Sequence, residues 1–204
     1  MMAYRYLNEQ HALELLQTKK WKVGRLLELN DPADCQPTLW GAPMQASDEA
    51  TAAFESKYLS GIYEDIGVLC FSGVISDPVI SSHYADSHRG MAIGYDFQPS
   101  GARLYEVQYQ EERATLDYNE AQLLRPNGET TQAFIEKVIT HGFTRKAPSW
   151  SYEKEFRIFT HLAHCRMEGA HYFLSSGGAP NRVVLGLRCK TTEADVRGSF
   201  KTVV

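Results

Sequence analysis

The sequence of 204 residues lacks an excess of positive charge, because 21 lysines and arginines are outnumbered by 25 aspartates and glutamates. The basic field that attracts nucleic acid or a membrane surface is therefore absent, and neither partner is expected. No apolar stretch approaches the ~20 residues that a membrane span needs. The N-terminal segment also lacks the cationic and apolar regions of a secretion signal, so we expect a cytoplasmic protein.

The common nucleotide-binding and hydrolase motifs are missing as well. No glycine-rich dinucleotide fingerprint follows a predicted strand, and the chain has no phosphate-binding loop. The patterns G-x-S-x-G and H-E-x-x-H are absent, which argues against a serine hydrolase and a zinc protease. The four cysteines lie far apart in the chain, without the close pairs of zinc or redox sites, so we expect reduced and mostly buried thiols.

The chain does contain enough apolar residues for one well-buried core, at 43% hydrophobic and 11% aromatic. We expect residues 1–204 to form a single domain. Strands are predicted at 3–7, 23–32, 67–75, 90–97, 103–110, 149–159 and 182–189, and helices at 9–20, 47–62, 130–142 and 191–200. This order lacks the regular strand–helix alternation of a doubly wound fold. It predicts an α+β fold with a mixed or mostly antiparallel sheet and flanking helices.

The run SWSYEKEFRIF, residues 149–159, alternates with the period of a strand. As a strand, it places Glu153, Glu155 and Arg157 on one face. Two carboxylates at this spacing repel each other unless they are solvated or matched by a cation, and the arginine can neutralise one of them. The face is either a solvated sheet surface or part of a cleft, and a cleft requires polar groups from remote strands.

A short segment rich in histidine offers a second set of polar side chains. His83, Asp86 and His88 are residue types that bind transition metals. Their spacing matches no known ligand pattern, so no metal site is predicted, and a metal-dependent nuclease or hydrolase that uses them with a glutamate stays an alternative. We expect His83 and Tyr84 to line a cleft, from a loop that ends at Gly90.

Several motifs together resemble a known family. The motifs YRYL and NDP, the long block GVLCFSGVISDPVISSHYADSHRGMAIGYDF and the block YEKEFRIF are similar to the bacterial domain-of-unknown-function family numbered twenty-nine seventy-one. The likeness spans nearly the whole chain, but a poorly characterised family implies little about function. The chain departs from the usual pattern at Ser81, where tryptophan is usual, and at Ala33 and Asp34, where the family continues with Phe-Glu.

The order of three polar positions also resembles the mono-ADP-ribosyltransferase fold. Members of that fold carry an arginine or histidine on the first strand, a serine or tyrosine on a central strand, and an E-x-E or single glutamate on a later strand. Arg5, Ser72 and the run Glu153-Lys154-Glu155 match that order, although a cysteine precedes the serine where a first hydroxyl is usual. The resemblance implies an ADP-ribosyltransferase-like fold and an enzyme that uses NAD as its substrate.

The resemblance implies a role for each matched residue. Cleavage of the nicotinamide–ribose bond develops an oxocarbenium-like cation, which the Glu155 carboxylate would stabilise. Glu153 would orient the acceptor or act as a general base, and Arg5 would hold a cofactor phosphate. Ser72 would support the pocket by a hydrogen bond to Glu155.

Further cofactor-binding residues are predicted around these. Tyr84 or Tyr152 would stack on the nicotinamide ring, and His83 and Arg157 complete the predicted set. The implied partners are a small-molecule nucleotide and a macromolecular acceptor, for an enzyme that modifies a macromolecule or cleaves NAD in a toxin or phage-conflict setting. The alternative from another class is a non-catalytic binding or regulatory module, in which residues 149–159 present a charged sheet surface.

Overall fold

The computed structural model describes residues 1–40, 53, 59–99, 101–125, 129–175 and 180–197. The strands are β1 Met2–Leu7, β2 Lys20–Arg25, β3 Thr38–Trp40, β4 Ile66–Ser72, β5 Met91–Asp96, β6 Tyr105–Glu106, β7 Gln108–Tyr109, β8 Thr115–Asp117, β9 Arg145–Lys146, β10 Glu155–His161, β11 Arg166–Glu168, β12 His171–Ser175 and β13 Arg182–Leu185. The helices are α1 Glu9–Thr18, α3 Ser60–Asp65, α4 Pro78–Tyr84, α5 Tyr118–Leu123, α6 Gln132–Lys137 and α7 Glu193–Val196. The helix predicted over 47–62 lies mostly outside the described residues.

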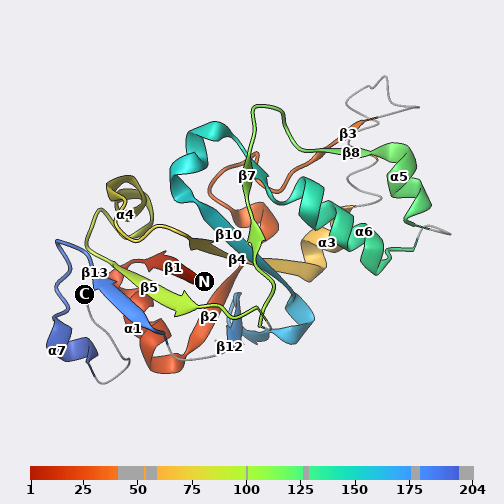
Figure 1. The fold of residues 1–204 in the computed structure, drawn as a ribbon. Helices are drawn as coiled ribbons and strands as arrows, with labels where there is room; N and C mark the ends of the chain where they lie inside the picture. Colours follow the sequence, from red (N-terminus) through yellow and green to blue (C-terminus); the bar gives the residue numbers. More distant parts are fainter. Residues whose placement is uncertain (41–52, 54–58, 100, 126–128, 176–179, 198–204) are drawn as a thin grey trace.

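Most strands belong to one sheet in which the neighbours are antiparallel (Figure 1). The strand order is β11-β12-β2-β4-β1-β5-β13, and β10 pairs with both β4 and β6. Among the described strands, parallel pairing is confined to two small sheets, β3 with β8 and β7 with β9. The predicted α+β fold with a mostly antiparallel sheet and flanking helices is confirmed.

The large sheet divides at β4. One edge of this strand pairs with β10 over its whole length. The other edge is shared, because β2 pairs with it at Gly67 and Val68, whereas β1 pairs with it at Ser72. Between these points, residues 69–71 have no partner on that edge among the described strands. Strands β1 and β2 therefore diverge from one another beside the middle of β4.

Two apolar cores lie on opposite faces of β4 and β10, because successive strand side chains alternate in direction. Leu69, Phe71 and Ile158 belong to the first core, together with the buried face of α1 and residues of β5. Ile66 and Val68 belong to the second core, together with residues of α3 and α6. In Figure 1, α1 and α6 accordingly lie on different sides of the central strands.

Two predicted elements differ in part from their sequence patterns. The strand predicted over 23–32 is β2, which ends at Arg25 and is followed by a 3₁₀ turn. Trp21 and Val23 of this strand enter the first core, while Leu26 enters the second, so the chain has to turn between them. The helix predicted over 130–142 is α-helical only to Lys137 and continues as a π-helical turn.

The predicted loop that carries His83 and Tyr84 is instead the helix α4. The side chain of Asp77 accepts hydrogen bonds from the backbone of the first turn, and Pro78 occupies the first helical position. This is a strong start signal for a helix, because the cap satisfies free N–H groups and proline has the required φ. The helix presents Tyr84 at its C-terminal end.

Residues 149–159 do not form one strand, contrary to prediction. A 3₁₀ turn spans Pro148–Glu153, Lys154 has a left-handed backbone with φ 45° and ψ 54°, and β10 begins only at Glu155. Proline favours the turn because its φ is restricted to helical values. The left-handed residue then redirects the chain into the strand, and from Glu155 onward the predicted alternation is confirmed.

The predicted C-terminal helix begins as expected. Thr192 and Asp195 form a capping box at the start of α7. None of the described helices reaches the length and hydrophobicity that a membrane crossing requires.

Candidate active site

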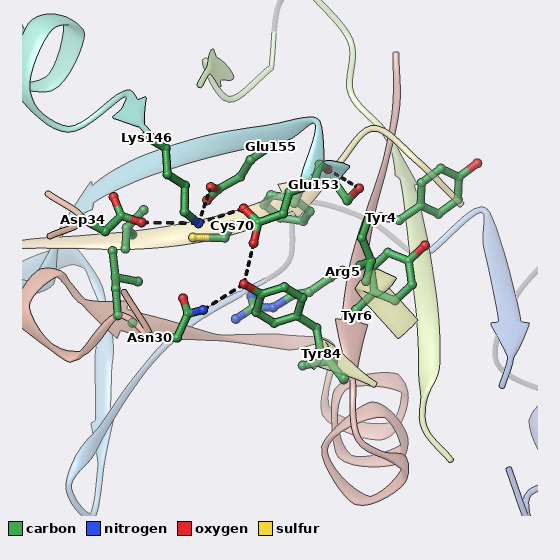
Figure 2. A pocket seen from close by; sticks show the side chains of 17 residues that line it. Tyr4, Arg5, Tyr6, Asn30, Asp34, Cys70, Tyr84, Lys146, Glu153 and Glu155 are labelled. Carbon is green, nitrogen blue, oxygen red and sulfur yellow. Dashed lines mark hydrogen bonds and ion pairs between the residues drawn. The ribbon is translucent and has the colours of Figure 1, made fainter. Parts of the chain in front are cut away.

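A cavity of about 250 Å³ lies beside β4, where β1 and β2 diverge. Its walls come from β1, β2, β4 and α4, from the segment that follows β2, and from the residues before and at the start of β10. Five predicted site residues line it: Arg5, Ser72, Tyr84, Glu153 and Glu155. Figure 2 shows four of them, all except Ser72, around one space.

Glu153 and Glu155 meet at the ammonium group of Lys146. The Lys146 Nζ atom lies 2.7 Å from Glu153 Oε2 and 3.3 Å from Glu155 Oε2, and it also lies 3.5 Å from Asp34 Oδ2 (Figure 2). Strand β9 places this lysine through its parallel pairing with β7. Burial by itself would lower the pKa of Lys146, but the three carboxylates outweigh it and raise that pKa. The lysine therefore stays positively charged.

Arg157 is the second cation of the site and has no exposed surface. Its Nη1 and Nη2 donate to the two oxygens of Asp34 at 2.8 and 2.6 Å. Its Nε and Nη2 donate to the two oxygens of Glu155 at 2.8 and 2.9 Å. Arg157 thus neutralises Glu155, as predicted, but it lies behind that residue and outside the cavity lining. The alternative prediction, that these residues form a solvated charged sheet surface, is wrong, because Glu153 and Glu155 are each only 5% exposed.

The two glutamates differ in their electrostatic environment. Burial tends to raise the pKa of Glu155, but the charge and hydrogen bonds of Arg157, with further help from Lys146, lower it to about 2. Burial raises the pKa of Glu153, and Lys146 offsets this only in part. Glu155 is therefore a permanent carboxylate, whereas Glu153 is the group that can exchange a proton.

Tyr84 connects Glu153 to the segment after β2. Its hydroxyl donates to Glu153 Oε1 at 2.5 Å and accepts from Asn30 Nδ2 at 2.9 Å (Figure 2). Burial and the adjacent Glu153 carboxylate raise the pKa of this hydroxyl, so it stays protonated. Its ring lines the cavity, as expected for a stacking residue.

Arg5 extends from β1 into the divide between β1 and β2. One guanidinium nitrogen, Nη2, donates to the carbonyl of Lys22 on β2. The other, Nη1, is buried and has no hydrogen-bond partner in the described part of the chain. Burial lowers the pKa of Arg5, and no carboxylate appears among the groups that offset this effect. Arg5 thus offers a positive charge and a free donor at the β1 wall.

Ser72 lines the cavity but does not bond to Glu155, contrary to prediction. Its hydroxyl donates to the backbone carbonyl of Glu153 at 2.6 Å and accepts from the N–H of Val74. The serine therefore holds the end of the 3₁₀ turn against β4. It positions Glu153 through the main chain, because that turn brings the carbonyl to Ser72.

His83 and Tyr152 lie outside the cavity lining. His83 is exposed, and its Nδ1 is 3.0 Å from the hydroxyl of Tyr152. The ring of Tyr152 is also 6.1 Å from the ring of Trp150, measured between centroids. Of the two tyrosines predicted as stacking residues, only Tyr84 reaches the cavity.

His83, Asp86 and His88, the residues considered as metal ligands, do not form a common site. Asp86, Ser87 and His88 follow α4 in a left-handed turn with φ of 47°, 52° and 68°. Within the described residues, no group of three histidine, cysteine, aspartate or glutamate side chains is placed to hold a metal ion.

Sequence analysis missed three residues of the site. Asp34 and Asn30 flank the turn that follows β2, where Asp31 accepts a hydrogen bond from the N–H of Ala33. The NDP motif marks this turn, so it could have pointed to them. Lys146 had no sequence signal, because its role depends on acids that approach from other elements.

Comparison with known proteins identified one family. A model of the family described as protein of unknown function (DUF2971) matches residues 82–158, which confirms the predicted resemblance over this segment. The matched segment runs from the end of α4 into β10, and it includes neither Arg5 nor Ser72. No curated protein and no solved structure matches the chain.

Proposed function

We propose that this protein, which matches the DUF2971 family model over residues 82–158, is an ADP-ribosyltransferase-like enzyme, which cleaves the bond between nicotinamide and ribose in NAD. One observation carries the proposal. Arg5 on β1, Ser72 on β4 and Glu155 on β10 come from three separate strands and line the same cavity. A catalytic role requires that polar groups from remote strands meet in one cleft, and these three residues do so. Their convergence also supports an ADP-ribosyltransferase-like arrangement of the fold.

The size of the cavity indicates which part of NAD it receives. Its volume of about 250 Å³ is below the ~300–1,000 Å³ of pockets that enclose a drug-sized ligand. It therefore suits the nicotinamide–ribose end, with the adenine end outside. The ring of Tyr84 would pack on nicotinamide, and the free Nη1 of Arg5 would bind a phosphate oxygen.

The cleavage step uses the different charge states of the two glutamates. The bond between the ribose carbon and the ring nitrogen breaks, its electron pair goes to the nitrogen, and neutral nicotinamide leaves. Positive charge develops on the ribose and is stabilised by Glu155, which its cationic neighbours keep ionised. An acceptor hydroxyl or water forms the new bond to the ribose carbon and transfers its proton to Glu153. With water, the products are ADP-ribose, nicotinamide and a proton.

The direct test is release of nicotinamide from NAD by the purified protein. Glu153→Gln and Glu155→Gln are each expected to slow release by ~100-fold to 1,000-fold, the usual effect of removing one electrostatic group from a site. Glu14→Gln on the exposed side of α1 is the matched control and should retain the wild-type rate. Circular dichroism of each variant separates loss of chemistry from loss of folding.

The same preparation decides whether the proposal stands. Absence of nicotinamide release, together with absence of NAD binding in calorimetry, contradicts it. A rate that is the same in Glu153→Gln, Glu155→Gln and wild-type protein contradicts the assignment of these residues. A macromolecular acceptor would be revealed by transfer of label from adenine-labelled NAD to protein or nucleic acid in the presence of cell extract.

A further inference from the structure

The buried charges beside the cavity do not balance. Asp34, Glu153 and Glu155 supply three negative charges, and Lys146 and Arg157 supply two positive ones. No other cation of the described residues forms an ion pair with these three carboxylates. With all five groups ionised, the cluster carries one surplus negative charge in a site that excludes most water.

The surplus charge lies at Glu153. Asp34 and Glu155 each contact both cations, whereas Glu153 contacts Lys146 alone, at 2.7 Å. Its other oxygen accepts from the neutral hydroxyl of Tyr84. Glu153 is also part of the cavity wall, so a ligand can approach it.

Among the described residues, the cavity lining has one further charged residue, the cation Arg5, which lies on a different wall from Glu153. Arg5 stands on β1, and its hydrogen bond goes to the β2 backbone and not to a carboxylate. The titratable groups around Glu153 are Lys146 from β9, Glu155 from β10 and Tyr84 from α4, with Tyr109 and Tyr152 further out. The three tyrosines are neutral at physiological pH, so none of them offsets the surplus.

We propose that the Glu153 end of the cavity selects ligands that carry a positive charge, and that it binds the oxidised, cationic pyridinium form of a nicotinamide nucleotide in preference to the reduced, uncharged form. The identity of the ligand rests on the proposed function. The charge preference rests on the unequal number of buried acids and bases, and it adds the redox state of the substrate to that function.

The ionisation of Glu153 couples this preference to pH. Burial raises the pKa of Glu153, so the free protein keeps a proton there up to a higher pH than an exposed glutamate would. A cationic ring favours the ionised carboxylate and displaces that proton, whereas a neutral ring does not. Binding of the oxidised form should therefore release protons, and its advantage should increase as the pH rises.

Calorimetry with matched ligands tests the proposal. Oxidised and reduced NAD differ in the charge of the ring, and 1-methylnicotinamide and nicotinamide form a smaller pair without a bond to ribose. We expect the cation of each pair to bind at least about tenfold more tightly to the wild-type protein. Titrations in two buffers of different ionisation enthalpy should show proton release for the cation only. The preference should vanish in Glu153→Gln and persist in Glu14→Gln.

The outcomes separate this proposal from the proposed function. Equal affinities within each pair, or a preference that survives Glu153→Gln, overturn the charge selection even if nicotinamide is released from NAD. Tighter binding of the cationic ligands without release of nicotinamide from NAD supports the charge selection and contradicts the proposed enzymatic activity. No binding of any of the four ligands overturns both. If Glu153→Gln does not fold, proton release and the pH dependence in the wild-type protein decide.

Discussion

Both faces of the β4–β10 pair are buried and both contribute to an apolar core, but only one of them also carries buried charges. One face contributes Leu69, Phe71 and Ile158 to an apolar core. The other face, at the end of β4 near β1, carries the Glu155–Arg157 pair of β10, and the cation also binds Asp34. Apolar burial stabilises a fold directly, whereas buried ion pairs lose most of their attraction to desolvation.

This difference indicates what each face is for. An apolar set of similar volume in place of the ionic cluster would often give equal or greater stability. The cluster therefore adds little stability compared with the apolar side chains that could fill the same volume. What it does provide is a fixed carboxylate at Glu155 and a titratable one at Glu153, both at the edge of a cavity.

The largest expected effect comes from breaking the ionic face. Arg157→Met leaves Asp34 and Glu155 buried without their main cation, so we expect a loss of ~3–5 kcal/mol in the free energy of unfolding, measured with urea. The control is Arg166→Met, which removes an ion pair to Glu168 whose arginine is 77% exposed. That change should cost less than about 1 kcal/mol. Equal effects for the two substitutions would contradict the distinction between the faces.

The ionic face should supply a large, separable part of the pH dependence of stability in acid. Because the pKa of folded Glu155 is about 2 against an ordinary 4.5, its ionised form stabilises the fold. This contribution, roughly 3 kcal/mol, is complete above about pH 4.5 and is lost as the pH falls toward 2. Urea unfolding at a series of pH values should show the full loss in wild-type protein and a loss smaller by about this amount in Glu155→Gln.

The apolar face supplies the control for this measurement. Leu69→Ala should lower stability by ~2–5 kcal/mol at every pH and leave the pH dependence unchanged.

Glu153 acts in the opposite direction to Glu155, because its raised pKa means that ionisation above pH 4.5 opposes folding. If Glu155→Gln retains the full loss of stability in acid, the assignment of that loss to Glu155 is wrong.

The smallest expected effect comes from the turn between the two glutamates. Lys154 has φ 45°, and glycine adopts this left-handed conformation at lower cost, so Lys154→Gly should raise stability by up to about 1 kcal/mol. Lys19→Gly, at φ 55° beyond α1, should produce a similar gain. Only Lys154→Gly should lower the rate of nicotinamide release, because it loosens the turn that sets Glu153 relative to Glu155. A loss of stability in both variants would show that neither backbone is strained.

Local patterns were sufficient for much of the fold. The helices predicted over 9–20 and 191–200 and the alternation from Glu155 onward correspond to α1, α7 and β10. Their causes lie within a few residues, as the cap at Asn8 and the capping box at Thr192 show. The strand predicted over 149–159 began too early. Its alternating residues satisfied the period of a strand, while Pro148 and the left-handed Lys154 turned its first half into a 3₁₀ turn.

By itself, the sequence determined the α+β composition, because local propensities are properties of short segments. The candidate set of Arg5, Ser72 and the two glutamates came from a resemblance in the order of polar residues along the chain. Only the tertiary structure decided which of them share a cavity and which charge state each carries. Asp34, from a distant part of the chain, is linked to Glu155 through Lys146, which binds both carboxylates from strand β9. A pKa depends on burial and on the nearest charges, and both are set by the packing of remote segments.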